Sequence, residues 1–455
     1  MKTSLIAACL LLVAACGKRA PHPARNTPPA PPAFWVWHRS SALKPAEEAA
    51  LKQAGIRTLY WQVAECAWLN GGWNLVRTSS PLARTAELQV IPVYRIQAQP
   101  AFLKAPGAAG LLAEQIRKGT DGAAPSAEIQ LDFDCPDSML GGYAKFLKSL
   151  GEQVAPTRIS ITALAGWPRR PEFGELARSV CLLAPMFYDL EADEPAQVLA
   201  DRLHPMADPS VTDLIRLWAD CPRPWLAGLP NFERLSVFKA NGNLTGHLRG
   251  WEPDPVFFHP NLLARSMDDG VTLFEVKAPV VLSGTRIQPG DLLVHRTPDA
   301  RVLAMLASAA RDAGASGMVY FALPGPGMQA AFSPAHLVYQ ANSTRPQPVL
   351  ALGKNNTLVL HNPGPADLPT RNWELSIHSD QSGAFQSASP GGFAEMEDAE
   401  GVPAELAGTL VLRFSRLSAG QSLVSGPVIH NPAGLTWQIR NLTEKQALDS
   451  ANSAR

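Results

Sequence analysis

Two aspartates end one apolar segment of this chain, and their spacing is typical of acid–base chemistry. If residues 128–134 form a strand, Gln130, Asp132 and Asp134 lie on one face and the apolar residues on the other. Two neighbouring carboxylates that lose water repel each other, so one should have a raised pKa and could serve as an acid. The alternative is structural: one aspartate caps the following helix and the other makes a core hydrogen bond.

Polar side chains also end several other predicted strands. Met186, Tyr188 and Asp189 end one strand, Glu65 ends a second and Arg95 ends a third. We interpret Glu65 and Asp189 as candidate catalytic carboxylates and the other three residues as substrate contacts. A charge at such a position is more often an ordinary surface residue. The shared position at strand ends is therefore what favours a site.

Tryptophans are concentrated in the same part of the chain. A flat indole ring stacks well on the C–H face of a sugar, and its N–H can bond a hydroxyl group. We expect two or three of these rings to line a cleft, with Trp37 and Trp61 as substrate contacts beside Gln130, and the rest to be core. The tryptophans concerned are Trp35, Trp37, Trp61, Trp68, Trp73 and Trp167.

Short apolar strands alternate with helical stretches across residues 34–326. Eight such units predict a (β/α)8 barrel, in which reactive groups come from the C-terminal ends of the strands. The alternative, an open doubly wound sheet, lacks a G-x-G-x-x-G after its first strand. Residues 231–295 form a less regular stretch that interrupts this rhythm. The predicted strands cover 34–38, 58–64, 89–96, 128–134, 158–164, 180–188, 225–229 and 317–323.

Residues 345–445 have a different sequence pattern from the residues before them. Short strands alternate there with Gly, Pro, Asn and Asp, and no segment has a clear helical period. This pattern predicts a β-sandwich domain. The sandwich either binds carbohydrate or braces the barrel.

The N-terminus predicts a lipid anchor. A short basic start, an apolar run and Val13-Ala14-Ala15 precede Cys16, so residues 1–15 read as a signal peptide with a lipoprotein cleavage site. Cys16 would carry acyl chains, including palmitate, and the Pro-rich residues 16–33 would form an extended tether. The alternative is an ordinary cleaved signal. Because Gly17 follows the cysteine, we expect an outer-membrane location in the cell envelope, facing the periplasm or exterior.

Composition excludes several classes of protein. Lys plus Arg equals Asp plus Glu at 40 each, and no basic block follows the start, so nucleic acid is not an expected partner. No later apolar run is long enough for a membrane-spanning helix. The four remaining cysteines have no zinc-like spacing, and neither a metal nor a cofactor is predicted. We expect these to be buried free thiols: Cys66, Cys135, Cys181 and Cys221.

Two segments resemble the chitinase-type glycoside hydrolase barrels, which have a D-x-x-D-x-D-x-E strand and an M-x-Y-D strand. They are LDFD at 131–134 and MFYD at 186–189. The resemblance implies that Asp132 and Asp134 match the second and third aspartates of the family. Ile129 stands in place of the first aspartate, and Pro136 in place of the acid glutamate.

The segments FWVWHR, YWQVAE, LDFDCP and YFALP, taken together, also resemble a family of uncharacterised bacterial lipoproteins. That resemblance covers residues 34–326 and implies fold and location rather than a reaction.

The leading hypothesis is a membrane-anchored hydrolase of envelope or environmental polysaccharide. Asp134 would be the acid or charge stabiliser, Glu65 or Asp189 its partner, and Asp132 its support, because such hydrolysis needs two carboxyl groups across the scissile bond. The alternative is a glycan-binding or envelope-assembly lipoprotein that has lost catalysis, as the proline at position 136 implies. A metal-dependent deacetylase is disfavoured because only His38 lies at a strand end.

Overall fold

The computed structural model describes the chain from residue 31 onward, with gaps. The predicted signal peptide, Cys16 and most of the tether lie outside the described residues. The described ranges are 31–77, 88–97, 99–119, 126–268, 270–325, 327–339, 346–381, 384–385, 389–398, 408–428 and 434–442.

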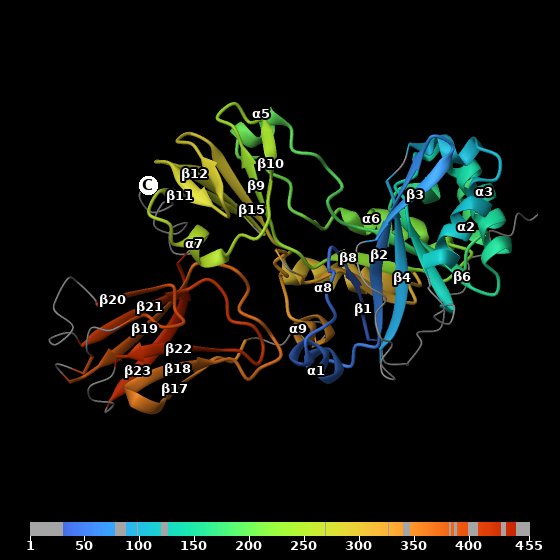
Figure 1. The fold of residues 1–455 in the computed structure, drawn as a ribbon. Coiled ribbons are helices and arrows are strands. Elements are labelled where there is room, and N and C mark those ends of the chain that lie inside the picture. Colours follow the sequence, from blue (N-terminus) through green and yellow to red (C-terminus); the bar gives the residue numbers. More distant parts are fainter. Residues whose placement is uncertain are drawn as a thin grey trace, which may run out of the picture. The chain divides into compact units, whose positions relative to one another are not determined.

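Eight parallel strands close into a barrel (Figure 1). Strand β1 pairs in parallel with both β16 and β2, which joins the two ends of the sheet and completes the ring. The prediction of a (β/α)8 barrel is therefore confirmed, and the open sheet is excluded. In ring order the strands are β1 (Ala33–Val36), β16 (Gly317–Leu323), β8 (Leu226–Pro230), β7 (Leu182–Met186), β6 (Arg158–Leu164), β5 (Glu128–Asp132), β4 (Gln89–Ile96) and β2 (Thr58–Leu69).

One further strand extends this sheet. Strand β3 (Gly72–Arg77) folds back antiparallel on the distal half of β2 and was not predicted. Asn70 and Gly71, between the two strands, both have positive φ, which makes the reversal possible.

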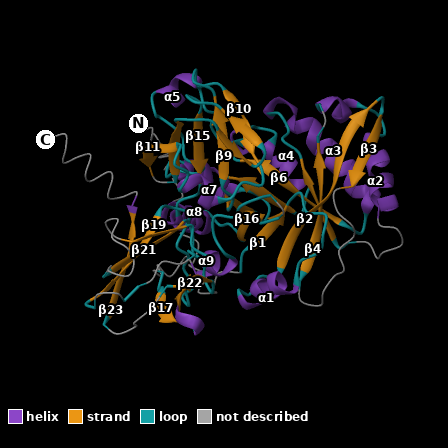
Figure 2. Cartoon of the chain, turned by 60° about the vertical axis from the view of Figure 1, so that its left-hand side comes forward, coloured by secondary structure: helices purple, strands orange, loops and turns teal. Residues whose placement is uncertain are grey.

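Helices cover the outside of the ring (Figure 2). In α3, the buried residues Leu140, Tyr143, Leu147 and Leu150 follow the helical period and form the core-facing stripe. The helices are α1 (Pro45–Gln53), α2 (Ala108–Gly119), α3 (Leu140–Val154), α4 (Phe173–Arg178), α5 (Pro195–Leu199), α6 (Val211–Arg216), α7 (Pro253–Phe257), α8 (Ala300–Asp312) and α9 (Pro334–Tyr339). The 3-10 turns are η1 (Pro100–Lys104), η2 (Asp137–Met139), η3 (Trp167–Arg169), η4 (Leu217–Asp220) and η6 (Lys354–Asn356).

The inside of the barrel is packed with side chains. Trp35, Tyr60, Val93 and Val319 belong to one buried apolar cluster there. Gln130 lies among them with no exposed surface, and its Oε1 accepts a hydrogen bond of 2.7 Å from the indole Nε1 of Trp35. This pair shows how a polar group is accommodated in the barrel interior.

Gly228 of β8 allows this interior to close. A Cβ atom there would lie 2.7 Å from the carbonyl oxygen of Pro185 and 2.9 Å from Cη2 of Trp35. We expect Gly228→Ala to lower the free energy of unfolding by about 1–3 kcal/mol, the usual cost of overpacking. Gly110→Ala in α2 is the matched control, because nothing lies within 4 Å of its Cβ position. Equal unfolding midpoints in urea for the two variants would contradict this packing.

The less regular stretch of sequence, residues 231–295, is an ordered insertion in the barrel. It forms a five-stranded antiparallel sheet with its own apolar core around Leu235, Val256 and Leu293. Antiparallel hairpins break the strand–helix rhythm, which is why the pattern looked less regular. The strands are β10 (Leu244–Leu248), β9 (Arg234–Phe238), β15 (Leu292–Arg296), β12 (Val271–Val276) and β11 (Leu262–Asp268), with a separate hairpin of β13 (Val280–Leu282) and β14 (Thr285–Ile287).

Antiparallel sheets follow the barrel, as predicted. Residues from two sheets share one core, which includes Leu360, Leu375 and Leu412. The three-stranded sheet contains β17 (Val349–Leu352), β18 (Thr357–His361) and β22 (Ser422–Pro427). The four-stranded sheet contains β20 (Glu395–Asp398), β21 (Thr409–Phe414), β19 (Trp373–Ser379) and β23 (Leu435–Asn441).

A buried polar cluster ties these sheets to the barrel and its insertion. Glu233, in the loop after β8, accepts a hydrogen bond of 2.6 Å from Thr370 Oγ1 and lies 2.9 Å from Nε2 of His295 in β15. Both Glu233 and His295 have side chains with no exposed surface. This cluster favours a bracing role for the C-terminal sheets.

Two of the four cysteines expected to be buried are buried, Cys66 and Cys135, whereas Cys181 and Cys221 are half-buried. Cys66, Cys135, Cys181 and Cys221 all have free thiols. Burial raises the pKa of the Cys66 and Cys135 thiols to about 12, so both stay protonated and unreactive at neutral pH. Within the described ranges, no helix is long and apolar enough to cross a membrane.

Candidate functional site

One arginine links both aspartates of the predicted site. Arg95 Nη1 lies 2.5 Å from Asp132 Oδ2, and Arg95 Nη2 lies 3.6 Å from Asp134 Oδ2. The barrel register explains the first contact, because β4 and β5 are neighbours and place Arg95 opposite Asp132. Burial lowers the pKa of Arg95, but the carboxylates of Asp132, Asp134 and Glu65 outweigh it, so that pKa lies above its ordinary value. Arg95 therefore stays charged.

Asp132 is the aspartate with the raised pKa. Burial raises the pKa of its carboxyl group, and Asp134 adds to this, while Arg95 and Thr162 act in the opposite direction. Thr162 Oγ1 donates a hydrogen bond of 2.7 Å to Asp132 Oδ1. The side chain is 3 % exposed and each oxygen has a protein partner, so Asp132 is enclosed by the protein. It fixes Arg95, which in turn contacts Asp134.

Asp134 has the opposite environment. Its side chain is 54 % exposed, and an ion pair to Arg95 is its contact. Neither aspartate caps the next helix, since both η2 and α3 begin without a side-chain cap. The structural alternative is thus wrong for helix capping, although Asp132 does make the predicted core hydrogen bond. Asp134 is the aspartate that a substrate can reach.

Glu65 joins this group from β2. The register of β2 and β4 places Glu65 opposite Arg95. Gln62 Nε2 donates a hydrogen bond of 3.3 Å to Glu65 Oε1, and Gln62 Oε1 accepts one of 3.1 Å from the backbone N–H of His38. Gln62 was not predicted as a site residue; the signal was an amide inside an otherwise apolar strand.

His38 lies at the same end of the barrel, just after β1. Burial lowers the pKa of its imidazole, as do the nearby charges of Arg249 and Arg95, while Glu65 opposes them. The ring is therefore neutral at pH 7 and can accept or donate one hydrogen bond. Arg249 belongs to the insertion, so the sequence pattern could not place it here.

Tyr188 completes the group beside β7. Its ring stacks on Phe321 at a centroid distance of 6.0 Å and meets Phe232 edge-on at 6.0 Å. Burial, followed by the charges of Asp132 and Asp134, raises the pKa of the phenol well above its ordinary value. The hydroxyl therefore stays protonated and remains a hydrogen-bond donor close to the aspartates. Phe232 and Phe321 were not predicted, because neither carries a polar group.

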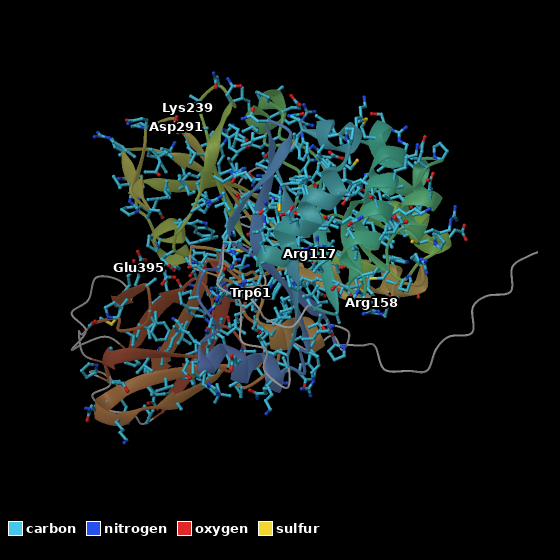
Figure 3. The ribbon with its side chains drawn as sticks, turned by 45° about the vertical axis from the view of Figure 1, so that its right-hand side comes forward. Trp61, Arg117, Arg158, Lys239, Asp291 and Glu395 are labelled. Carbon is cyan, nitrogen blue, oxygen red and sulfur yellow. The ribbon has the colours of Figure 1, made fainter. Side chains whose placement is uncertain are left out.

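The remaining predicted contact residues have little exposed surface: Trp37, Trp61 and Gln130 are buried, and Met186 is half-buried. Trp61, labelled in Figure 3, is 1 % exposed and belongs to the core shared with the helices, and its Nε1 donates to the Arg39 carbonyl at 3.4 Å. Gln130 accepts its hydrogen bond from Trp35 inside the barrel. Trp37 is 6 % exposed and packs edge-on against Phe321, and Met186 is half-buried against the same cluster.

Asp189 is directed elsewhere. Its Oδ2 lies 2.5 Å from Nη1 of Arg234 on β9, so it ties the end of β7 to the insertion. The structure thus groups Asp134 and Glu65 around Arg95 and gives Asp189 a different arginine. The sequence could not separate these carboxylates, because Arg234 lies in the less regular stretch.

These contacts define a (β/α)8 barrel with a charged site at the C-terminal ends of its strands. A family profile described as "Domain of unknown function (DUF3142)" matches residues 87–184, the segment that carries Arg95, Asp132 and Asp134. No curated protein matches the chain.

Similar solved structures include chitinases and a spore cortex-lytic enzyme. The chitinase ChiA74 from Bacillus thuringiensis has 10% identity and a TM-score of 0.44, covering 90% of this chain and 100% of its own. The spore cortex-lytic enzyme SleL of Bacillus megaterium QM B1551 has 14% identity and a TM-score of 0.45, covering 67% of this chain and 73% of its own. A chitinase from Chromobacterium violaceum ATCC 12472 has 14% identity and a TM-score of 0.44, covering 70% and 100%.

Proposed function

We propose that the protein is an exported lipoprotein whose barrel binds a polysaccharide and hydrolyses it with Asp134 and Glu65. One observation carries the proposal: a single arginine, Arg95, has the exposed Asp134 and the half-buried Glu65 beside it at the C-terminal ends of the barrel strands. Reactive groups of this fold lie at that end. Glycoside hydrolysis requires two carboxyl groups on either side of the scissile bond.

The two carboxyl groups have distinct roles in this proposal. Asp134, the more accessible, donates a proton to the glycosidic oxygen, and Glu65, oriented by Gln62, stabilises the positive charge that develops on the sugar or activates water. Tyr188 donates a hydrogen bond to the sugar near the reacting carbon. Arg95 balances the negative charge of the carboxylates, and Asp132 holds Arg95 in place.

A second candidate is glycan binding without cleavage. Pro136 supports it, because this exposed residue occupies the position of the acid glutamate in the chitinase-type motif and cannot donate a proton. Incubation of the full chain with a polysaccharide panel separates the candidates. New reducing ends support hydrolysis, and retention of a glycan without new ends supports binding alone. If the protein neither releases reducing ends nor retains a glycan, both candidate functions are overturned.

The lipid anchor is a separate part of the proposal and is tested by fractionation. We expect the wild-type protein in the membrane fraction, labelled by a palmitate analogue, and Cys16→Ser in the soluble fraction without label. Cys9→Ser is the matched control and should behave as the wild type, because Cys9 would be removed with the signal. Membrane-bound, labelled Cys16→Ser protein would rule out the anchor.

A further inference from the structure

The insertion places a charged side chain at the proposed site. Arg249 follows β10 directly, and its neighbour Gly250 donates a backbone hydrogen bond of 3.0 Å to the carbonyl of Gly327. Gln329 Nε2 donates a hydrogen bond of 3.0 Å to the carbonyl of the next residue, Trp251. The two residues that follow Arg249 are thus fixed to the loop that follows the last barrel strand, β16.

That loop passes over the end of β1. A Cβ atom on Gly325 would lie 3.3 Å from the carbonyl oxygen of Trp37, the residue before His38, and Met328 packs against the apolar cluster inside the barrel. The charge of Arg249 acts on His38 directly, as does that of Arg95. Three parts of the chain, distant in sequence, therefore hold Arg249 beside the C-terminal ends of the strands.

Arg249 differs from the other cations of this region in having no partner. Arg95 is paired with Asp132 and Asp134, and Arg234 with Asp189. Within the described ranges Arg249 makes neither a hydrogen bond nor an ion pair, and its side chain is exposed. A guanidinium held by its backbone yet left unpaired can bind a carboxylate in a bidentate manner.

We propose that Arg249 selects glycans that carry carboxylates, an inference that rests on the proposed binding of polysaccharide at this site. The carboxylates of Asp134 and Glu65 repel a second negative charge, so the preferred chain carries its charges at intervals, with neutral sugars between them. A strand of alternating N-acetylglucosamine and N-acetylmuramic acid has this pattern. A polyuronate, charged on every sugar, does not.

The test is a binding titration of the full chain at low salt with three probes. They are the alternating strand, the same strand with its carboxylates converted to amides, and a polyuronate. We expect wild type to bind the alternating strand about threefold to fivefold more tightly than the amidated one, as for an exposed ion pair. Arg249→Gln should abolish that difference without weakening binding of the amidated strand.

Arg286→Gln is the matched control, because Arg286 is an exposed arginine of the same insertion, on β14. It should retain the wild-type preference. Equal binding of the two strands by wild type, an unchanged preference in Arg249→Gln, or tighter binding of the polyuronate would overturn the inference about Arg249. If wild type binds no glycan of this set or of the polysaccharide panel, the proposed function itself fails.

Discussion

Asp134→Asn is expected to lower the rate of glycan cleavage by about a hundredfold to ten-thousandfold, the usual contribution of a general acid. Asparagine keeps the shape of the side chain but cannot donate the proton. The fold should not suffer, because the side chain is 54 % exposed and Arg95 keeps its ion pair with Asp132. Rates of reducing-end release from the substrate found in the polysaccharide panel measure the effect, and urea unfolding verifies stability.

Asp137→Asn is the matched control for this variant. Asp137 lies three residues further along, and its carboxylate pairs with Arg170 at the surface. Its replacement should leave the cleavage rate within about twofold, as expected for a surface ion pair of small energy. If Asp134→Asn retained more than half of the wild-type rate, Asp134 would not be the acid.

Arg95→Met is expected to lower the free energy of unfolding by about 3–5 kcal/mol, the cost of breaking a buried ion pair from one side. Asp132 is 3 % exposed, and without Arg95 its carboxylate keeps only the hydrogen bond from Thr162. In an Asp132→Asn background the same replacement should cost less, because no buried charge is then left behind. Urea unfolding of the two single variants and the double variant measures this coupling.

The cost of Arg95→Met should depend on pH through Asp132. The pKa of Asp132 is raised in the folded state, so its protonated form favours folding. This contribution of Asp132 to stability is complete below the pKa that its carboxyl group has in the unfolded chain. It is lost as the pH rises through the pKa of Asp132 in the folded protein. Without Arg95 the pKa of Asp132 rises further, so the loss in free energy of unfolding caused by Arg95→Met should be smaller at mildly acidic pH. A deficit that is the same at mildly acidic and neutral pH, or no coupling in the double variant, would contradict the role given to Arg95.

Periodicity predicted the barrel because each strand is an apolar run next to a helix. Strands β4, β6 and β16 have the predicted bounds, and the C-terminal sheets were recognised from short strands with turn residues. The insertion was missed because its antiparallel strands follow no strand–helix alternation. Its contributions, Arg234 beside Asp189 and Arg249 beside His38, were missed for the same reason.

The site was only partly predictable. The alternation of side chains along a strand assigns each residue to one face of the sheet, but it does not show how buried the residue is or which residues it contacts. Asp132 ends β5 and Asp134 lies two residues beyond it; both contact Arg95, yet Asp132 is enclosed by Arg95 and Thr162 and Asp134 is exposed. Trp61 shows a second limit: strands of a parallel barrel are buried on both faces, so an aromatic residue can face the helices as well as the inside. Long-range contacts, which the local pattern does not contain, decide these cases.

A structure of the Asp134→Asn variant with a bound oligosaccharide is the most direct test of glycan binding and cleavage by the barrel. The variant should retain the glycan without cutting it. We predict a sugar ring beside Tyr188, with its glycosidic oxygen within hydrogen-bond distance of the residue-134 side chain and Glu65 on the other side of the bond. A glycan bound only at the C-terminal sheets, or with no contact to Tyr188, residue 134 or Glu65, would contradict the proposed site.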